Sequence, residues 1–290
     1  MTKQSELVKN IVRATVPRDV RNWLRSPAKT AEWLWDSVRF SFGNTRTLHF
    51  PSGHSIICHP HAYKVFYLAQ IEDASQREEF RNFELHCSDK MVLFDVGAHY
   101  GVFSLAAAQV GGTAIAVDPS PTALEMIAIE SVLNGCGDRV QLLQAAVSDT
   151  NGVMSMLSSG VFSAGYFKVV RDRSNRDLTK TQAVTIDQIV VNYGVPTHIK
   201  IDVEGHEAAV LRGAKETLSR YSPLLFLELH NEMIRSEGGD PGSSLDELAK
   251  LGYAPRRFDG KILSRSDILG QAIIRCLASR RNPGEYLATR

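Results

Sequence analysis

Short apolar runs alternate with helical patterns through residues 91–229 of this chain. The strand-like runs are Met91–Val96, Thr113–Val117, Val140–Ala145, Thr197–Ile201 and Leu224–Leu229. The helical patterns between them are Tyr100–Gln109, Pro121–Leu133 and Glu207–Leu218. Runs rich in Val, Ile and Leu that are separated by helices are typical of a parallel sheet covered on both faces. The pattern predicts an α/β protein with a doubly wound, Rossmann-like and mostly parallel sheet.

The segments before this core predict a helical and hairpin extension, residues 1–88. Residues 1–40 form an amphipathic helical pattern that includes Trp33 and Trp35. We interpret it either as a cap packed on the main domain or as a surface that touches a membrane or a lipid-linked substrate. Residues 45–50 and 55–59 flank a turn-rich linker and predict a hairpin. A polar helix is expected over residues 74–85.

The main domain is predicted to cover residues 89–270, followed by a basic tail, residues 271–290. Residues 152–170 and 178–184 are partly alternating, and we expect a hairpin insertion beside the site. A helix over 244–251 and an antiparallel hairpin of 253–257 with 261–264 are expected to close the edge of the sheet.

Composition is ordinary for a soluble globular protein, with 43% hydrophobic and 22% charged residues. A net charge of +1 excludes a global attraction to nucleic acid, although both ends of the chain are basic. The four cysteines lie far apart without a C-x-x-C pair, so we expect free thiols in a reducing compartment. The sequence shows no signal-peptide pattern and no apolar run of about 20 residues, which predicts a cytoplasmic protein, with membrane association through the N-terminal region as an option.

The most informative motif is Asp95-Val-Gly-Ala-His-Tyr-Gly101, where an apolar strand pattern ends in a glycine turn before a helix. Gly97 and Gly101 allow a tight turn and close approach of a ligand, although such turns also occur without ligands. The G-x-G-x-x-G spacing of a dinucleotide site is absent. A carboxylate at Asp95 would repel a pyrophosphate and suits a ligand with a cationic end. S-adenosylmethionine (SAM), with its ammonium and sulfonium, becomes the leading cofactor.

Two further strand ends contribute candidate binding residues. Asp118-Pro119 follows the turn by about 20 residues, where an acid binds ribose hydroxyls in a dinucleotide fold. Asp118 does not discriminate NAD from SAM, and the simpler alternative is a helix N-cap. The third strand ends at Gln144-Ala145-Ala146.

The fourth strand end is crowded with ionisable residues, namely Asp202, Glu204, His206 and Glu207. Crowded acids raise one another's pKa values and cluster at functional sites. The alternative is a capped helix start with Glu207 in its first turn. Glu228 and His230 join the cluster if their strand is the neighbour. These side chains could supply a general base or hold a divalent cation.

Together these motifs resemble the FkbM family of class I SAM-dependent methyltransferases over roughly residues 65–265. The resemblance implies methylation of hydroxyl groups on sugars, glycolipids or secondary metabolites. The family commonly has Asn where this chain has His99, and Glu-Pro where it has Asp118-Pro119. The expected SAM-binding residues are Asp95, Gly97, Ala98, Gly101, Asp118, Pro119, Ala145, Ala146 and Asp202.

The expected reaction is in-line attack of a substrate oxygen on the SAM methyl carbon, aided by orientation and a general base. The candidates for the base are His206, Glu204 and Glu228, with Asp202 near the sulfonium. A cation held by Asp202, Glu204 and Glu228 is the less favoured alternative. The expected partner is a small-molecule, glycan or glycolipid acceptor.

Three other functions predict features that the sequence does not show. A nicotinamide oxidoreductase predicts a third glycine and no acid at Asp95, and the sequence has neither. A non-catalytic binding module predicts a degenerate site, whereas the expected acids and glycines are present. A nucleic-acid methyltransferase could use the basic ends, but the chain has no recognised nucleic-acid motif and no Asn-Pro-Pro-Tyr-type tetrapeptide.

Overall fold

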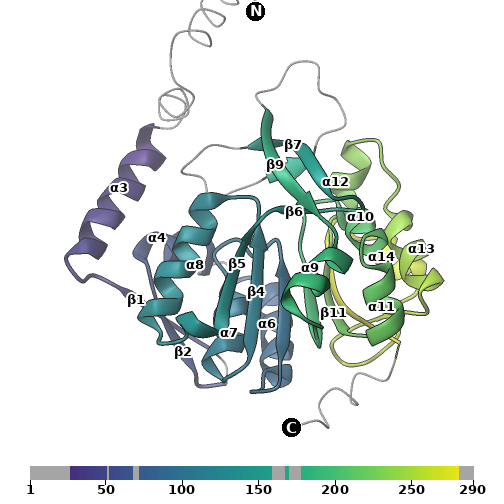
Figure 1. Ribbon diagram of the computed structural model, residues 1–290, viewed down its shortest axis with the longest axis horizontal. Coiled ribbons are helices and arrows are strands. Elements are labelled where there is room, and N and C mark those ends of the chain that lie inside the picture. Colours follow the sequence, from purple (N-terminus) through teal and green to yellow (C-terminus); the bar gives the residue numbers. More distant parts are fainter. Residues whose placement is uncertain (1–26, 51, 68–71, 159–166, 170–177, 281–290) are drawn as a thin grey trace, which may run out of the picture.

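The computed structural model describes residues 27–50, 52–67, 72–158, 167–169 and 178–280. The central element is a seven-stranded sheet with helices on both faces (Figure 1). From one edge to the other, its strands are β12 (Ala254–Arg256), β13 (Ile274–Ser279), β11 (Leu224–Leu229), β10 (His198–Ile201), β3 (Val92–Val96), β4 (Thr113–Asp118) and β5 (Val140–Gln144). The strands run parallel except β13, which pairs antiparallel with both β11 and β12. The predicted doubly wound, mostly parallel sheet with an antiparallel C-terminal edge is therefore confirmed.

Two buried apolar clusters lie on the two faces of this sheet, because neighbouring strand residues such as Leu93 and Phe94 point to opposite sides. The first face is covered by α6 (Ala74–His86), α7 (Val102–Gln109) and α8 (Pro121–Leu133). The second face is covered by α9 (Ile186–Tyr193), α10 (Glu207–Arg212), α11 (Lys215–Tyr221) and α13 (Gly242–Lys250). Shorter elements complete this part of the chain: η2 (Gly137–Arg139), α12 (Asn231–Ser236) and α14 (Arg265–Leu269).

A second, four-stranded sheet stands above the central one in Figure 1. Its order is β6 (Ala146–Val147), β9 (Leu178–Val184), β7 (Gly152–Ser158) and β8 (Phe167–Val169). Strand β7 pairs antiparallel with β8 and β9, which confirms the predicted hairpin insertion. Since β6 follows directly after β5, the second sheet rises from the carboxyl edge of the central sheet, the edge where ligands bind in doubly wound folds.

The N-terminal part of the described chain packs on the first face. Strands β1 (Arg46–His49) and β2 (Ser55–Cys58) form the predicted antiparallel hairpin, followed by α4 (Pro60–Ala62) and η1 (Tyr63–Tyr67). Asn134 docks β2 on the end of α8, because its side-chain amide accepts from Ile57 N at 2.8 Å and donates to Ile57 O at 2.7 Å. Buried Asp36 of α3 (Pro27–Ser41) pairs with Lys64 at 3.0 Å. Residues 27–41 therefore cap the domain, whereas residues 1–26 lie outside the described chain.

Three predictions about the second half of the chain were wrong. The helix expected over 207–218 is two helices, which are separated at Gly213 and Ala214. Gly213 lies so close to Ser148 that an added Cβ would be 2.0 Å from the Ser148 carbonyl oxygen. The hairpin expected from 253–257 and 261–264 is only a single bridge between Arg256 and Ile262. The partner of β12 is instead β13, so residues 274–279 are a buried strand and not part of a tail.

Helix α9 was not predicted. The four cysteines are unpaired, as expected. Within the described chain, no helix combines the length and the apolar character needed to cross a bilayer.

Candidate active site

The loop after β3 is built against the neighbouring strand ends. Gly97 has a φ of +79°, and a Cβ added there would lie 1.8 Å from the carbonyl oxygen of Asp202. The amides of Gly97 and Ala98 both donate to Val117 O, at 2.9 and 3.1 Å. The sequence predicted a glycine for close approach of a ligand, but the structure shows that the backbone of Asp202 already requires it.

The second glycine of the loop has a packing role as well. Gly101 has a φ of +75° at the N-cap of α7, and an added Cβ would lie 2.7 Å from Ile127 Cγ1 of α8. Between the two glycines, His99 also has a positive φ, of 51°, and its ring lies edge-on to that of Tyr100 at 4.4 Å. A non-glycine residue in this region is uncommon and is typical of functional loops.

Asp95 anchors the first turn of α7. Its Oδ2 accepts hydrogen bonds from Ser104 N at 3.1 Å and from Ser104 Oγ at 2.6 Å. Burial raises the pKa of Asp95, while the Ser104 hydrogen bonds and the charge of Lys200 oppose that rise. The carboxylate thus has a structural task that the charge argument from sequence did not foresee.

Asp118 ties the first loop to the second. Its Oδ2 accepts from His99 N at 2.9 Å and its Oδ1 accepts from Ser120 N at 2.8 Å. Burial raises the pKa of Asp118 to about 7, although both hydrogen bonds oppose it. The N-cap of α8 is Ser120, so Asp118 is not itself the cap that the alternative interpretation required. Further along the same carboxyl edge, Ala145 and Ala146 are buried where β5 ends and β6 begins.

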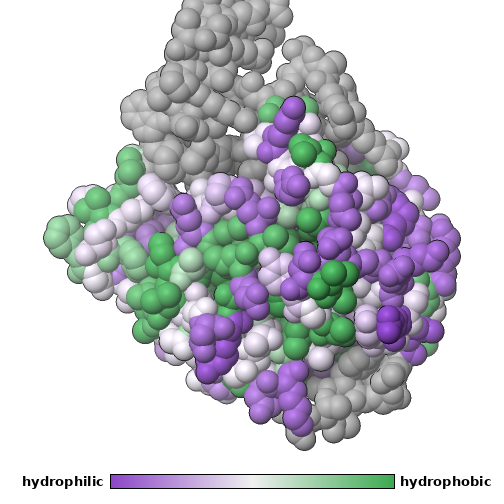
Figure 2. All heavy atoms as spheres, in the orientation of Figure 1, coloured by the Kyte–Doolittle hydropathy of each residue, from purple (hydrophilic) through white to green (hydrophobic). Residues whose placement is uncertain are grey.

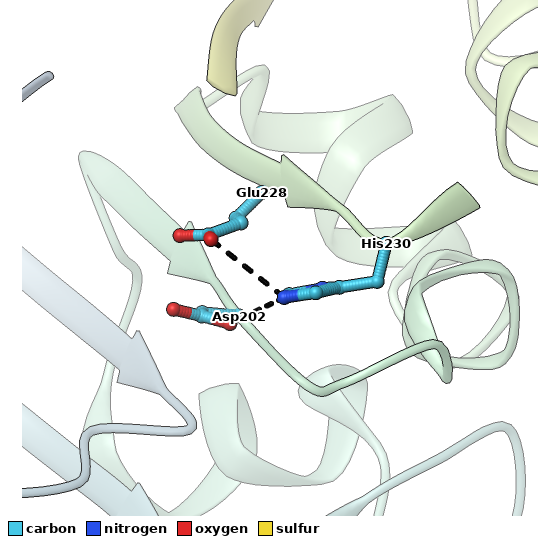
Figure 3. A group of neighbouring side chains, drawn as sticks. All are labelled: Asp202, Glu228 and His230. Atoms are coloured by element: carbon cyan, nitrogen blue, oxygen red, sulfur yellow. Dashed lines mark ion pairs between the residues drawn. The ribbon is translucent and has the colours of Figure 1, made fainter. Parts of the chain in front are cut away.

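The next two strand ends bring Asp202, Glu228 and His230 together (Figure 3). Asp202 follows β10, whereas Glu228 and His230 come from the end of β11, the adjacent strand. His230 Nε2 lies 3.8 Å from Asp202 Oδ1 and 3.6 Å from Glu228 Oε1. The expectation that Glu228 and His230 would join the acid cluster is confirmed.

The orientation of His230 is set by Glu207, the first residue of α10. Glu207 is fully buried, and its Oε1 accepts from Gly205 N at 3.0 Å and lies 2.9 Å from His230 Nδ1. Burial alone would lower the pKa of His230, but the Glu207 hydrogen bond and the charges of Asp202 and Glu228 raise it to about 9. Glu207 therefore fixes the ring so that Nε2 faces the carboxylates.

A buried lysine lies behind these carboxylates. Lys200 on β10 is 1% exposed, and its Nζ lies 2.8 Å from Glu79 Oε1, 3.6 Å from Glu228 and 3.9 Å from Asp202. It also lies over the ring of Phe103 at 5.1 Å. The sequence indicated that Lys200 could point across the sheet but not what it would meet.

Glu79 and Arg275 are site neighbours that the sequence did not predict. Glu79 comes from α6 and Arg275 from β13; Arg275 Nε lies 3.5 Å from Glu79 and donates to Glu228 Oε2 at 3.1 Å. Burial raises the pKa of Glu228, but the charges of Lys200 and Arg275 outweigh it and lower that pKa. Burial and the charge of Glu228 raise the pKa of Asp202. In the sequence, these partners were indicated only by Lys200, which stands inside an apolar strand pattern. A buried lysine needs buried carboxylates close to it, because an unpaired buried charge is costly.

Two other predicted residues take different positions. Glu204 has a φ of +53°, is a quarter exposed, and its Oε2 lies 3.8 Å from His230 Nε2. His206 turns to the base of the second sheet, where its Nε2 lies 2.9 Å from Ser148 Oγ. Three of the four candidate catalytic residues therefore surround His230, whereas the hydrogen bond of His206 directs it toward Ser148.

A buried glutamate, Glu130, supports the loop after β3 through Tyr67. Tyr67 Oη donates to Tyr100 O at 2.8 Å and also contacts Glu130 Oε2, while Glu130 Oε1 accepts from His59 N at 2.8 Å. Burial raises the pKa of Glu130 from the usual 4.5 to about 8. The Tyr67 hydroxyl has only one proton, which it donates to Tyr100 O. Its contact with Glu130 Oε2 is a hydrogen bond if Glu130 is protonated and donates to the Tyr67 oxygen.

This arrangement predicts that Glu130→Gln stabilises the protein at alkaline pH. Because folding raises the pKa of Glu130 from 4.5 to about 8, the folded state holds this proton more tightly than the unfolded state does. The free energy of unfolding is therefore highest below pH 4.5 and falls as the pH rises to about 8. The amide mimics the protonated acid, so the variant should lack this loss, which amounts to ~1.4 kcal/mol per pH unit between the two pKa values. Urea unfolding at pH 5 and pH 9 measures it: we expect similar stabilities at pH 5 and a more stable variant at pH 9. A variant that is less stable than wild type at pH 9 would contradict a protonated Glu130.

Comparison with known protein families gives one match over this site. The profile of the methyltransferase FkbM domain matches residues 95–255, which include the β3 loop, Asp118 and the cluster around His230. A comparison with curated proteins gives no match.

Several solved structures are similar to this chain at low sequence identity, including the following three. A methyltransferase FkbM from Methylobacillus flagellatus KT is 17% identical with a TM-score of 0.46, and the match covers 69% of this chain and 46% of that one. A precorrin-6y C5,15-methyltransferase from Geobacter metallireducens GS-15 is 12% identical with a TM-score of 0.40, over 70% and 87% of the two chains. TYW2 of M. jannaschii in complex with AdoMet is 12% identical with a TM-score of 0.40, over 81% and 84%. This chain therefore spans less than half of the FkbM structure that it resembles.

Proposed function

The chain belongs to the FkbM methyltransferase family, and from this premise we propose that it is a SAM-dependent methyltransferase that methylates a hydroxyl oxygen of a sugar, glycolipid or secondary metabolite. One observation carries the proposal: Asp202, Glu204 and Glu228 surround His230 directly beside the β3 loop, where the backbone of Asp202 touches Gly97. A group that removes a proton is useful to an alcohol, which is a poor nucleophile at neutral pH.

We propose that SAM lies along the carboxyl ends of β3, β4, β5 and β10. The proposed contacts are those expected from the sequence: Asp95, Gly97, Ala98, Gly101, Asp118, Pro119, Ala145, Ala146 and Asp202. Asp118 would bind ribose hydroxyls with the lone pairs that its two backbone hydrogen bonds leave over. Asp202, 30% exposed in its side chain, would face the cationic end of SAM.

Among the candidate bases, Glu204 is the best placed. Glu228 is held by Lys200 and Arg275, and His206 by Ser148. Glu204 is partly accessible, and its left-handed backbone is the kind of strain that folds keep at working sites. Glu204 and His206 both line a cavity of about 270 Å³ between α10 and α12, whose other polar lining residues include Arg212 and Asp240.

The proposed reaction is a direct transfer of the SAM methyl group to the acceptor oxygen. SAM supplies a methyl group on its sulfonium sulfur. The acceptor oxygen forms the new bond to the methyl carbon as the sulfur–carbon bond breaks, and its proton passes to Glu204. Orientation of the two reactants supplies the larger share of the acceleration, about 7–11 kcal/mol, and a positioned base adds about 10²–10⁴-fold.

Among the three acceptor classes, the surface favours the glycolipid. On α3 and just after it, Leu34, Trp35, Val38 and Phe42 are exposed, Trp35 by 62% and Phe42 by 82%. Hydrophobic colour gathers at the left side of Figure 2, where Figure 1 places α3. Trp beside other apolar residues is typical of surfaces at a lipid–water interface, so we propose that α3 contacts the membrane or the lipid part of the acceptor.

The test uses labelled SAM with a panel of glycans, glycolipids and polyketides, and the variant Glu204→Gln. We expect label on an acceptor oxygen with the wild type, and a turnover about 10²–10⁴-fold lower with the variant, because the amide cannot take the proton. SAM affinity, measured by calorimetry, should stay unchanged.

The matched control is His206→Gln, which we expect to lower turnover far less because His206 bonds Ser148. Wild-type turnover in Glu204→Gln would contradict the base assignment. Label on carbon or nitrogen of every accepted substrate would contradict O-methylation.

A further inference from the structure

Each carboxylate of the Asp202–Glu228 pair presents one oxygen to Lys200 and the other to His230. Lys200 Nζ lies 3.9 Å from Asp202 Oδ2 and 3.6 Å from Glu228 Oε2. His230 Nε2 lies 3.8 Å from Asp202 Oδ1 and 3.6 Å from Glu228 Oε1. The lysine therefore neutralises the pair from one side and leaves an oxygen of each on the other side, together with an imidazole nitrogen.

We propose that Asp202, Glu228 and His230 form a binding site for a divalent metal ion. One ligand atom from each of these residues lies within 4.8 Å of the other two (Figure 3). Ligands held at about 2.1 Å from a shared ion are separated from one another by about 3.0 Å at right angles and about 3.6 Å at 120°. The observed 3.6–3.8 Å between nitrogen and oxygens is too long for direct hydrogen bonds and close to the spacing of ligands around one ion.

The histidine is oriented as a metal ligand would be. Its Nδ1 is engaged by buried Glu207 at 2.9 Å, and the whole side chain is 4% exposed. Metal-binding histidines almost always give their other ring nitrogen to a carboxylate or carbonyl, which fixes the tautomer and the ring orientation. Glu207 takes no part in the ligand set, so its contact is independent support for the site.

The charge balance also leaves room for a cation. Five carboxylates, those of Glu79, Asp202, Glu204, Glu207 and Glu228, lie in one connected cluster. Among the described residues, Lys200 and Arg275 contact this cluster as permanent cations. Arg275 contacts both oxygens of Glu228, so Glu228 would offer the ion a remaining lone pair. Excess buried negative charge is costly, and a divalent ion would offset part of it.

The donor set points to manganese or magnesium. Carboxylates suit Mg²⁺ and Mn²⁺, while a single imidazole shifts preference toward a first-row ion, so Mn²⁺ fits the mixture best. Resting on the proposed function, the ion would bind the acceptor hydroxyl and lower its pKa, and Glu204, whose Oε2 lies 3.8 Å from His230 Nε2, would receive the proton.

The experiment measures binding of Mn²⁺ itself to the full chain after treatment with EDTA and desalting. Calorimetry and the electron paramagnetic resonance signal of free Mn²⁺ give stoichiometry and affinity. We expect one ion per chain, at least a 10-fold weaker affinity in each of Asp202→Asn and His230→Gln, and a 10–100-fold weaker affinity in Glu207→Gln. His206→Gln, on the same turn but bonded to Ser148, is the control and should bind as wild type does.

Thermal unfolding without metal checks that each variant is folded. Absence of stoichiometric Mn²⁺ binding to the wild type would overturn the site, as would unchanged affinity in both Asp202→Asn and His230→Gln. Methyl transfer that continues in EDTA would refute the ion's role and leave the proposed function standing. Tight Mn²⁺ binding without methylation of any hydroxyl acceptor would refute the function and leave the site standing.

Discussion

Gly97→Ala is expected to abolish SAM binding and to prevent the protein from reaching a stable fold. The new Cβ would lie 1.8 Å from Asp202 O and 2.9 Å from Asp202 C, which are backbone atoms. They cannot retreat easily, because β3 and β10 are paired in register and Asp202 N donates to Val96 O at 3.0 Å. Overlap with backbone at a φ of +79° should cost more than about 4 kcal/mol. The yield of folded protein, the melting temperature and calorimetry with SAM measure the effect.

Gly135→Ala is the matched control. Gly135 has a similar φ of +67°, yet no atom lies within 4 Å of the position its Cβ would take. Its substitution therefore isolates the backbone strain, about 1–2 kcal/mol. If Gly97→Ala proved no worse than Gly135→Ala, the close contact between the β3 loop and Asp202 would be refuted.

Lys200→Met is expected to destabilise the protein by about 3–5 kcal/mol, because it leaves buried anions without their central cation. Glu79 and Glu228 are almost fully buried, and Lys200 Nζ lies 2.8 and 3.6 Å from them. Met has a similar length and keeps the packing against Phe103, so charge and not a cavity should dominate the loss. Urea unfolding at pH 7 gives the free-energy difference.

The double variant Lys200→Met with Glu79→Gln separates charge from packing. Removal of the partner anion should restore part of the stability lost in Lys200→Met, a coupling that a double-mutant cycle measures. A purely steric effect would leave the two losses additive. Loss of less than about 0.5 kcal/mol in Lys200→Met, the range of ordinary surface substitutions, would contradict the role of Lys200.

The acid cluster also gives a reason for the strained backbone of Glu204. A non-glycine residue at a φ of +53° costs on the order of 1–3 kcal/mol, and Gly205 beside it is also left-handed. The turn places Glu204 Oε2 3.8 Å from His230 Nε2, while Glu207, three residues later, lies 2.9 Å from Nδ1, the other nitrogen of the same ring. The strained backbone thus lets one short segment contact both sides of His230.

Local sequence determined most of the helices and strands of this protein, together with two parts of its site: the loop after β3 and the acids after β10. Apolar runs of four to six residues bounded by turns define the parallel strands, since period and composition are local properties. The same local reading located the loop from Asp95 to Gly101 and the acids from Asp202 to Glu207. It could not tell what Gly97 touches, because that contact joins residues 105 positions apart.

Tertiary structure decided which residues from distant segments join these two parts of the site. Strand β13 inserts between β11 and β12 and brings Arg275 to Glu228, while α6 packs on the sheet and brings Glu79 to Lys200. Gly213, between α10 and α11, packs against the backbone of Ser148, and the hydrogen bond of His206 with Ser148 directs this residue toward the second sheet. These outcomes depend on which distant segments meet. A buried Lys200 in the sequence requires an anion nearby, but only the packing of the whole chain selects which one, because burial and charge are properties of the folded state and not of the segment.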